Sequence, residues 1–329
     1  MRCGKHPLPD FEVENQGEKP IEFGLSSDFS VESKAAIDGT NYTDYGFIVQ
    51  AGLTVASEKT ESWKTNTVFG SNGTEVTYGT DGWGYSPARY WQYGSYSFAG
   101  AMPSSAGFTA SLDAATHKQL TLHFGDGGYD LRAGQDDIMV GFKTVNVQSA
   151  SSAPTVNFNF EHQLALVVIK GASLEPRTSI RIDKIEVYGN NFRTVGDMTF
   201  YQNGSSIVSE YVPTGPTSRT NVFQTLKPLA GTSWILPAAA SGAASYSTLV
   251  SGLLVFPEAC DFSIVVTYTD YYGGKDGVQS SKTGTLPVDW QSGMKYEYKF
   301  GVTLDDITFA EPTMRPWLPG DAVDTEIQM

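Results

Sequence analysis

The sequence predicts an all-β protein made of two β-sandwich domains in tandem, and three observations support this fold class. Charged residues make up only 18% of the 329 positions, while glycine and proline contribute 34 and 16 residues and aromatic residues 12%. Such a composition, rich also in Thr and Val, is typical of strands joined by turns. No window has the apolar spacing of an amphipathic helix, and short alternating segments recur in both halves of the chain.

The first strand is predicted over residues 21–31, after a polar spacer that covers residues 1–20. The apolar side chains of this stretch share one parity, and they are Ile21, Phe23, Leu25, Phe29 and Val31. Polar residues and glycine occupy the other parity, which is the pattern of a strand with one buried face.

The rest of the first half contains further strands, and a domain boundary follows them. The strands are expected over residues 45–50, 74–78, 96–102, 119–124 and 138–147, with glycine-containing turns between them. Residues 148–154 are small and polar and end in proline, so the boundary is placed there. The predicted organisation is a spacer over 1–20, sandwich domains over 21–150 and 151–318, and an acidic tail over 319–329.

The second half is equally rich in alternation. Residues 156–168 alternate with His162 among the apolar positions, and residues 262–268 form another strand. Between Ile182 and Ile185 the apolar phase slips by one residue, which predicts a β-bulge. The clearest strand covers residues 294–304, and its phase flips after Asp305-Asp306 to Ile307 and Phe309.

Charge and motifs exclude several classes of function. The net charge is −14 and no Lys/Arg cluster occurs, so a nucleic-acid partner is not expected. The longest unbroken apolar run covers residues 164–169, far short of the roughly 18 needed to span a membrane. Among four histidines, His117 and His123 would lie about 20 Å apart on an extended strand, and His162 is interpreted as structural. With no catalytic motif present, neither an enzyme nor a cofactor is expected.

Two acidic loops and one aromatic cluster are weaker candidates for ligand-binding sites. The acidic groups at 38–44 and 126–137 match no calcium-loop spacing, so they are interpreted as solvated turns and no metal is expected. Residues 83–98 hold seven aromatic side chains, which pack in most sandwiches but can also stack on sugars. Trp83 and Tyr85 are therefore candidate glycan contacts.

The N-terminus carries one cysteine with two interpretations. Cys3 stands before Gly4 and a Pro/Glu/Lys-rich spacer, as in the mature form of bacterial lipoproteins, and no apolar signal segment precedes it. Cys3 is thus either a lipid acceptor or a free thiol on a frayed end. The other cysteine, Cys260, precedes an apolar strand and is expected to be a buried thiol.

Three stretches, in order, resemble the fimbrillin (Mfa-like) family, the pilins and accessory subunits of Bacteroidales type V pili. Residues 90–103 are similar to that family's aromatic strand ending in proline. Residues 136–140 and 158–165 look like its last N-domain strand and the F-x-H-x-L-A strand that opens its C-domain. Residues 290–317 are similar to its closing tryptophan turn, alternating strand and terminal tryptophan.

The resemblance implies two transthyretin-like sandwiches, export by the lipoprotein route to the outer membrane, and assembly with other fimbrial subunits by strand exchange. It implies lipidation at Cys3, membrane attachment only through that lipid, and removal of the strand at 21–31. Family cleavage commonly follows a basic residue after this strand, which here is Lys34. The donor strand would come from the C-terminal part, where Ile307, Phe309, Trp317 and Leu318 supply apolar side chains.

The predicted function is therefore a cell-surface fimbrial subunit or adhesin, with a host or bacterial surface ligand as a further partner. A departing strand exposes a groove and two unpaired edges that another strand can fill. The alternatives are a first strand that never leaves, and a lipid-anchored surface protein that binds glycans through Trp83 and Tyr85.

Overall fold

The protein is all-β, which confirms the predicted fold class. The computed structural model describes residues 19–25, 42–54, 66–106, 108–124, 136–190, 196–204, 206–213, 224–228, 230–239, 244–273 and 275–317. Within these ranges the only helical elements are three 3₁₀ turns, Tyr42–Asp44, Ser104–Ala106 and Ala150–Ser152. The described part of the chain contains no helix long and apolar enough to cross a membrane.

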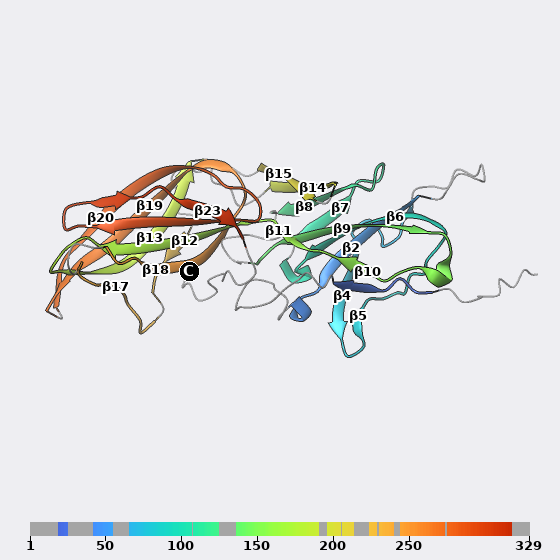
Figure 1. Ribbon diagram of the computed structural model, residues 1–329, viewed down its shortest axis with the longest axis horizontal. Helices are drawn as coiled ribbons and strands as arrows, with labels where there is room; N and C mark the ends of the chain where they lie inside the picture. Colours follow the sequence, from blue (N-terminus) through green and yellow to red (C-terminus); the bar gives the residue numbers. More distant parts are fainter. Residues whose placement is uncertain are drawn as a thin grey trace, which may run out of the picture.

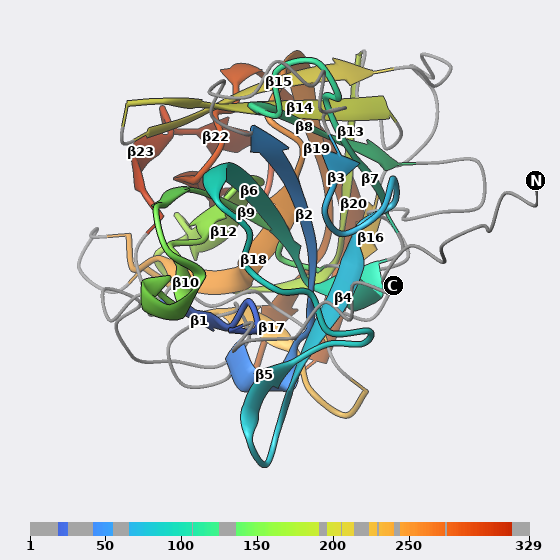
Figure 2. The same ribbon diagram turned by 90° about the vertical axis from the view of Figure 1, so that its right-hand side faces the viewer.

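The molecule is elongated, with strands of the N-terminal half at one end and of the C-terminal half at the other (Figure 1). An antiparallel sheet of the N-terminal half has the order β11-β9-β6-β2-β4-β5, with β3 beside β2. Its strands are β2 (Phe47–Thr54), β3 (Asn66–Thr67), β4 (Thr74–Gly79), β5 (Gly82–Gly84), β6 (Gly94–Met102), β9 (Met139–Val147) and β11 (Glu161–His162). The β4–β5 hairpin projects from this end of the molecule (Figure 2).

The first strand belongs to a separate two-stranded sheet. β1 (Phe23–Leu25) pairs in parallel with β10 (Val156–Phe158). The remainder of the predicted first strand, with Phe29 and Val31, lies outside the described residues, as do Lys34 and Cys3.

A four-stranded antiparallel sheet lies near the middle of the long axis (Figure 1). Its strands, in the order β15-β14-β8-β7, are β7 (Thr109–Leu112), β8 (Gln119–Phe124), β14 (Gly196–Asn203) and β15 (Ser206–Pro213). β8 and β14 pair from Gln119 opposite Tyr201 to Phe124 opposite Gly196. This sheet therefore joins the two halves of the sequence.

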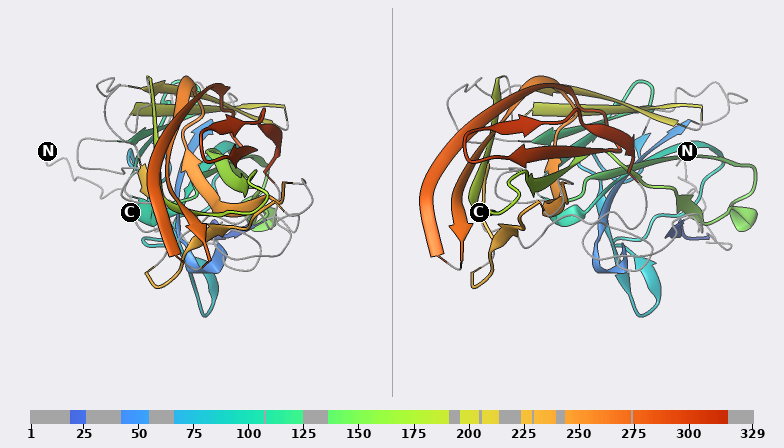
Figure 3. Two further views of the ribbon diagram at one scale, coloured as in Figure 1. Left: turned by 90° about the vertical axis from the view of Figure 1, so that its left-hand side faces the viewer. Right: turned by 60° about the vertical axis from the view of Figure 1, so that its left-hand side comes forward.

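The C-terminal half adds two more sheets, one of which contains the long curved β19–β20 hairpin (Figure 3). One sheet contains β12 (Ala165–Ser173), β18 (Ser247–Val255), β21 (Met294–Val302), β22 (Ile307–Phe309) and β23 (Thr313–Pro316). The other contains β13 (Ser179–Asn190), β16 (Gln224–Leu226), β17 (Trp234–Leu236), β19 (Ala259–Tyr272) and β20 (Lys275–Asp289). β12 and β21 run parallel over their whole paired length.

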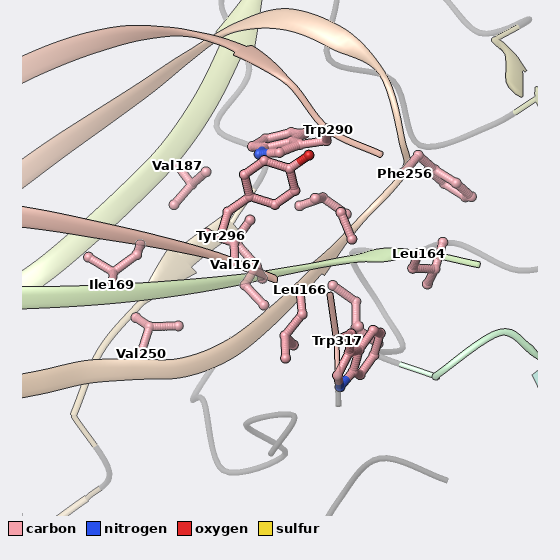
Figure 4. Close-up of a cluster of buried hydrophobic side chains, with 14 of the residues drawn as sticks. Leu164, Leu166, Val167, Ile169, Val187, Val250, Phe256, Trp290, Tyr296 and Trp317 are labelled. Atoms are coloured by element: carbon pink, nitrogen blue, oxygen red, sulfur yellow. The ribbon is translucent and has the colours of Figure 1, made fainter. Parts of the chain in front are cut away.

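A continuous core lies between the C-terminal sheets. Ile182 of β13 and Ile169 of β12 belong to the same buried cluster. Figure 4 shows a part of it, with Trp290 over Tyr296. The bulge predicted in β13 is confirmed, because the register with β19 shifts between Ile182 and Lys184. Because of this one-residue slip, the apolar side chains after the bulge point to the same core as those before it, and Ile185 and Val187 are buried.

The strand predicted over residues 156–168 is instead divided into β10, β11 and β12. The physical reason is that this stretch passes from one core to the other. Phe158 and Phe160 are buried in the N-terminal cluster, whereas Leu164 and Leu166 are buried in the C-terminal cluster. The domain boundary between residues 150 and 151 stays a prediction, and strand pairing crosses it at β10, β11 and β14.

Candidate functional site

The first strand lies between two segments of backbone that come from distant parts of the sequence. On one side the amide of Val156 donates a hydrogen bond to the carbonyl of Glu22 at 2.8 Å. On the other side the amide of Ile21 donates to the carbonyl of Arg89 at 2.8 Å. The segment around Ile21 thus fills the gap between β10 and the stretch that leads into β6.

The side chains of this strand reach into an aromatic groove. Ile21 and Phe23 are 1% and 6% exposed, and Leu25 is half-buried against the same cluster. Five rings surround Phe23 with centroids 5.5–6.2 Å from its own, and they are Phe47, Phe69, Tyr85, Phe98 and Phe158. The alternation seen in the sequence therefore corresponds to one face of the strand packing against these aromatic rings.

Tyr85 fixes the strand by its polar end. Its hydroxyl donates to the carbonyl of Ile21 at 2.9 Å and accepts from the amide of Arg89 at 3.2 Å. Burial of the phenol raises the pKa of Tyr85, which keeps the hydroxyl a donor. Lys19 adds a second link, because its Nζ donates to the carbonyl of Ala153 at 2.6 Å.

The groove also requires a small residue in the strand. A Cβ atom added at Gly24 would lie 2.4 Å from Oδ1 of Asn157 on the neighbouring β10. If the strand left, β10 and residues 89–91 would each present unpaired backbone groups beside the aromatic floor. This is an arrangement that an added β-strand can fill.

The two candidate glycan contacts have different surroundings. Trp83, on the projecting hairpin, is half-buried against Phe47, with ring centroids 5.1 Å apart, and it also contacts the exposed Tyr78 at 5.3 Å. The hydroxyl of Tyr85 is engaged by the first strand, as described above. Of the other aromatic residues between 83 and 98, Trp91, Tyr96 and Phe98 are buried, and Tyr90 and Tyr93 are exposed.

A clamp of three side chains, which sequence reasoning did not assemble, connects the C-terminal end of the described chain to β11. Nδ1 of His162 lies 3.0 and 2.9 Å from the two carboxylate oxygens of Asp137, and its ring stacks on Trp317 at 4.0 Å. Asp137 is only 4% exposed, so its interpretation as part of a solvated turn is wrong. The reason is that His162 pairs with a carboxylate that burial would otherwise penalise. In Figure 4, Trp317 lies beside Leu166.

Of the C-terminal apolar residues named as a donor strand, Ile307, Phe309 and Trp317 are folded back in this structure, and Leu318 lies outside the described residues. After β21 the chain turns, with the amide of Thr303 donating to the carbonyl of Asp306 at 2.9 Å, and β22 returns along β21. The phase flip in the sequence corresponds to this turn. Ile307 and Trp317 are buried, so donation to another subunit would first require the segment to leave β21.

The two other histidines that the structure describes, His117 and His123, do not form a shared site. His117 lies in the turn before β8 and is buried, whereas His123 on β8 contacts Asp197 of β14 at 2.5 Å. Across the ranges that the structure describes, there is no group of three or more His, Cys, Asp or Glu side chains placed to hold a metal ion.

These features define a β-sandwich protein whose first strand closes an aromatic groove, and comparison with known proteins gives its family. The fimbrillin-like family model matches residues 40–317, and the chain belongs to this family. A fimbrial protein from Bacteroides vulgatus is 16% identical with a TM-score of 0.59, covering 92% of this chain and 99% of that one.

Two further solved structures are described as candidate cell adhesion proteins. The one from Bacteroides ovatus is 15% identical with a TM-score of 0.49, and covers 93% of this chain and 100% of its own. The one from Bacteroides uniformis is 13% identical with a TM-score of 0.44, and covers 92% and 99%. No curated protein matches the chain. The family is one of fimbrial proteins of the cell surface, and not of enzymes.

Proposed function

We propose that this protein is a fimbrial subunit that assembles by strand exchange, with its first strand as the piece that is replaced. The observation that carries the proposal is the position of β1. β1 pairs with β10, the residues just before it (19–21) bond through their backbone to residues 89–91, and the ring of Phe23 lies among five other rings. Such a strand can be replaced by another without rearranging the sheets around it.

The free energy gained by burying the strand's side chains fits a stable but replaceable contact. Burial of Ile21 and Phe23 contributes about 1.5–3 kcal/mol each, before the entropy cost of ordering the strand. Phe29 and Val31 share their parity and would add to this. A donor strand with apolar residues at alternate positions would make equivalent contacts and gain main-chain hydrogen bonds on both edges.

In the proposed order of events, a protease cuts after Lys34, the severed first strand departs, and the C-terminal segment of a second subunit enters. Ile307, Phe309, Trp317 and Leu318 are the apolar residues that the donor would supply. Lipidation of Cys3 would hold the precursor at the outer membrane until this cut. Mass spectrometry of Cys3 from the membrane fraction tests the anchor separately, and an unmodified cysteine there removes it from the proposal.

The proposed exchange is tested by measuring how fast the cut first strand dissociates. The protein is cleaved with trypsin, and release of the N-terminal fragment is followed with and without a synthetic peptide of residues 307–318. We expect release to be slow alone, and to leave a trimmed protein that binds the peptide. A scrambled peptide of the same composition is the control. Resistance of Lys34 to trypsin while other loops are cut, or failure of the trimmed protein to bind the peptide, would remove the proposed exchange.

A further inference from the structure

A groove lies between the N-terminal sheet and the middle sheet. It consists of two adjoining cavities of about 320 and 260 Å³ that share Phe142, Thr144 and Gln202 in their walls. Together they fall in the size range of small-molecule sites, which occur preferentially where structural units meet.

Strands from opposite halves of the sequence form the sides of this groove. β9 contributes Phe142, Lys143 and Thr144, and the β14–β15 hairpin contributes Gln202 and Ile207. In Figure 1 the β14–β15 hairpin lies near the middle of the long axis, away from the projecting β4–β5 hairpin. Trp83 is not among the residues that line either cavity.

The neutral polar side chains of the groove are available for hydrogen bonds to a ligand. Four of them make no side-chain hydrogen bond with any described residue, and they are Ser97, Thr144, Asn159 and Gln202. Hydroxyl and amide groups that both donate and accept are the groups that recognise ligand hydroxyls. Beside them, the half-buried ring of Phe142 offers an apolar face.

Two lysines in the walls also lack partners in the described part of the chain. Lys118 lines one cavity and Lys143 the other, and neither forms an ion pair there. By contrast, three lysines elsewhere pair with glutamates, and they are Lys170, Lys184 and Lys299. Because the protein carries a net charge of −14, two unpaired cations in one groove favour an anionic ligand at that point.

The carboxylate in the groove is already engaged. Glu161 accepts a hydrogen bond from the amide of Ile207, and burial raises the pKa of its carboxyl. Glu161 therefore holds β15 against the N-terminal sheet, and its repulsion of an anionic ligand is reduced by that bond.

His117 forms a rigid wall at one end. It is 3% exposed and has a φ of 54°, a left-handed conformation that is uncommon outside glycine. Its ring packs so closely on Gly52 that a Cβ atom there would lie 1.9 Å from Cγ of the imidazole. Nε2 of His117 has no hydrogen-bond partner in the described structure. Strained, unsatisfied residues of this kind concentrate around binding sites.

We infer that this groove binds a short acidic saccharide. The ring of Phe142 would pack on the apolar face of a sugar, the hydroxyl and amide side chains would bind its hydroxyls, and Lys118 and Lys143 would pair with its carboxylate or sulfate groups. An acidic peptide is disfavoured, because extended peptides usually bind to unpaired strand edges, whereas this groove offers side chains. The inference goes beyond the proposed strand exchange and does not depend on it.

The test is a titration of the full chain with saccharides, followed by saturation-transfer NMR and calorimetry. The probes are sialyllactose, digalacturonate and a sulfated heparin disaccharide, with lactose as the neutral comparison and hexaglutamate as the peptide comparison. We expect saturable binding of at least one acidic saccharide, about tenfold or more tighter than that of lactose.

Variants place the binding in the groove. Lys118→Gln and Lys143→Gln should each weaken it about tenfold, and Gln202→Ala should weaken it for the same saccharide. Lys275→Gln, an exposed lysine on β20, and Trp83→Ala should leave it unchanged. The inference is overturned if none of the acidic saccharides binds at millimolar concentration, if the groove variants bind as well as the parent, if binding is lost with Trp83→Ala alone, or if hexaglutamate binds more tightly than every saccharide.

Discussion

Replacing Phe23 with alanine tests how firmly the first strand is held in its groove. The side chain is 6% exposed, and its burial contributes about 1.5–3 kcal/mol from transfer alone. The space left behind adds a cavity cost, because the surrounding rings belong to several different strands and can collapse only in part. We expect the free energy of unfolding of Phe23→Ala to fall by about 3–5 kcal/mol.

The assay is urea unfolding followed by tryptophan fluorescence, with Glu22→Ala as the matched control. Glu22 is exposed and precedes Phe23 in the same segment, so its replacement should change stability by less than about 0.5 kcal/mol. Hydrogen exchange adds a local measurement, because the amides of Val156 and Trp91 donate to carbonyls of this segment and should lose protection first. A cost below about 1 kcal/mol for Phe23→Ala, or an equal loss of protection throughout the molecule, would refute the reasoning.

Four further predictions follow from single contacts. Tyr85→Phe removes the hydroxyl that binds Ile21 and should cost about 0.5–1.5 kcal/mol in urea unfolding, whereas Tyr90→Phe should be neutral. Gly52→Ala forces the His117 ring to move and should cost about 1–3 kcal/mol by the same measurement, and a smaller cost would show that the turn yields easily. Burial lowers the pKa of His117, against the opposing effect of Asp113. As the pH is lowered through the unfolded value of 6.5, the unfolded chain therefore binds a proton that the folded chain does not, and the free energy of unfolding decreases. His117→Asn, which tolerates the left-handed backbone, should flatten the decline in stability between about pH 7 and 5, and an unchanged slope would contradict this assignment. Trp317→Ala should reduce hydrogen-exchange protection of β23 while Met314→Ala, an exposed position on that strand, should not.

The sequence was informative where alternation reports burial directly. The parity of Ile21 and Phe23 predicted which face of the first strand is buried, and the slip after Ile182 predicted the bulge in β13. Both are local signals, because a strand with one buried face must place alternate residues on the same side.

Long-range pairing was not predictable in the same way. The middle sheet pairs residues near 120 with residues near 200. The alternation within each segment predicts a strand but does not indicate which other strand it pairs with. β20 was missed because Gly277, Gly284 and Pro287 interrupt its pattern. Asp137 was misjudged because its partner His162 is 25 residues further on. The groove at Phe142 depends on the same long-range pairing, which is why the sequence pointed to the aromatic residues near 83 instead.

The central claim, that the first strand must leave for subunits to assemble, is tested most directly by locking it in place. A Cβ atom at Gly24 would lie 3.6 Å from Cγ of Asn157, so Gly24→Cys with Asn157→Cys can form a disulfide between β1 and β10. Cys3 and Cys260 are replaced by serine in this variant and in its parent. After trypsin cleavage, SDS-resistant ladders are compared before and after reduction. The account predicts a ladder for the parent, none for the oxidised lock, and recovery of the ladder when the lock is reduced. A ladder of equal extent from the oxidised lock, or none from the parent, would contradict it.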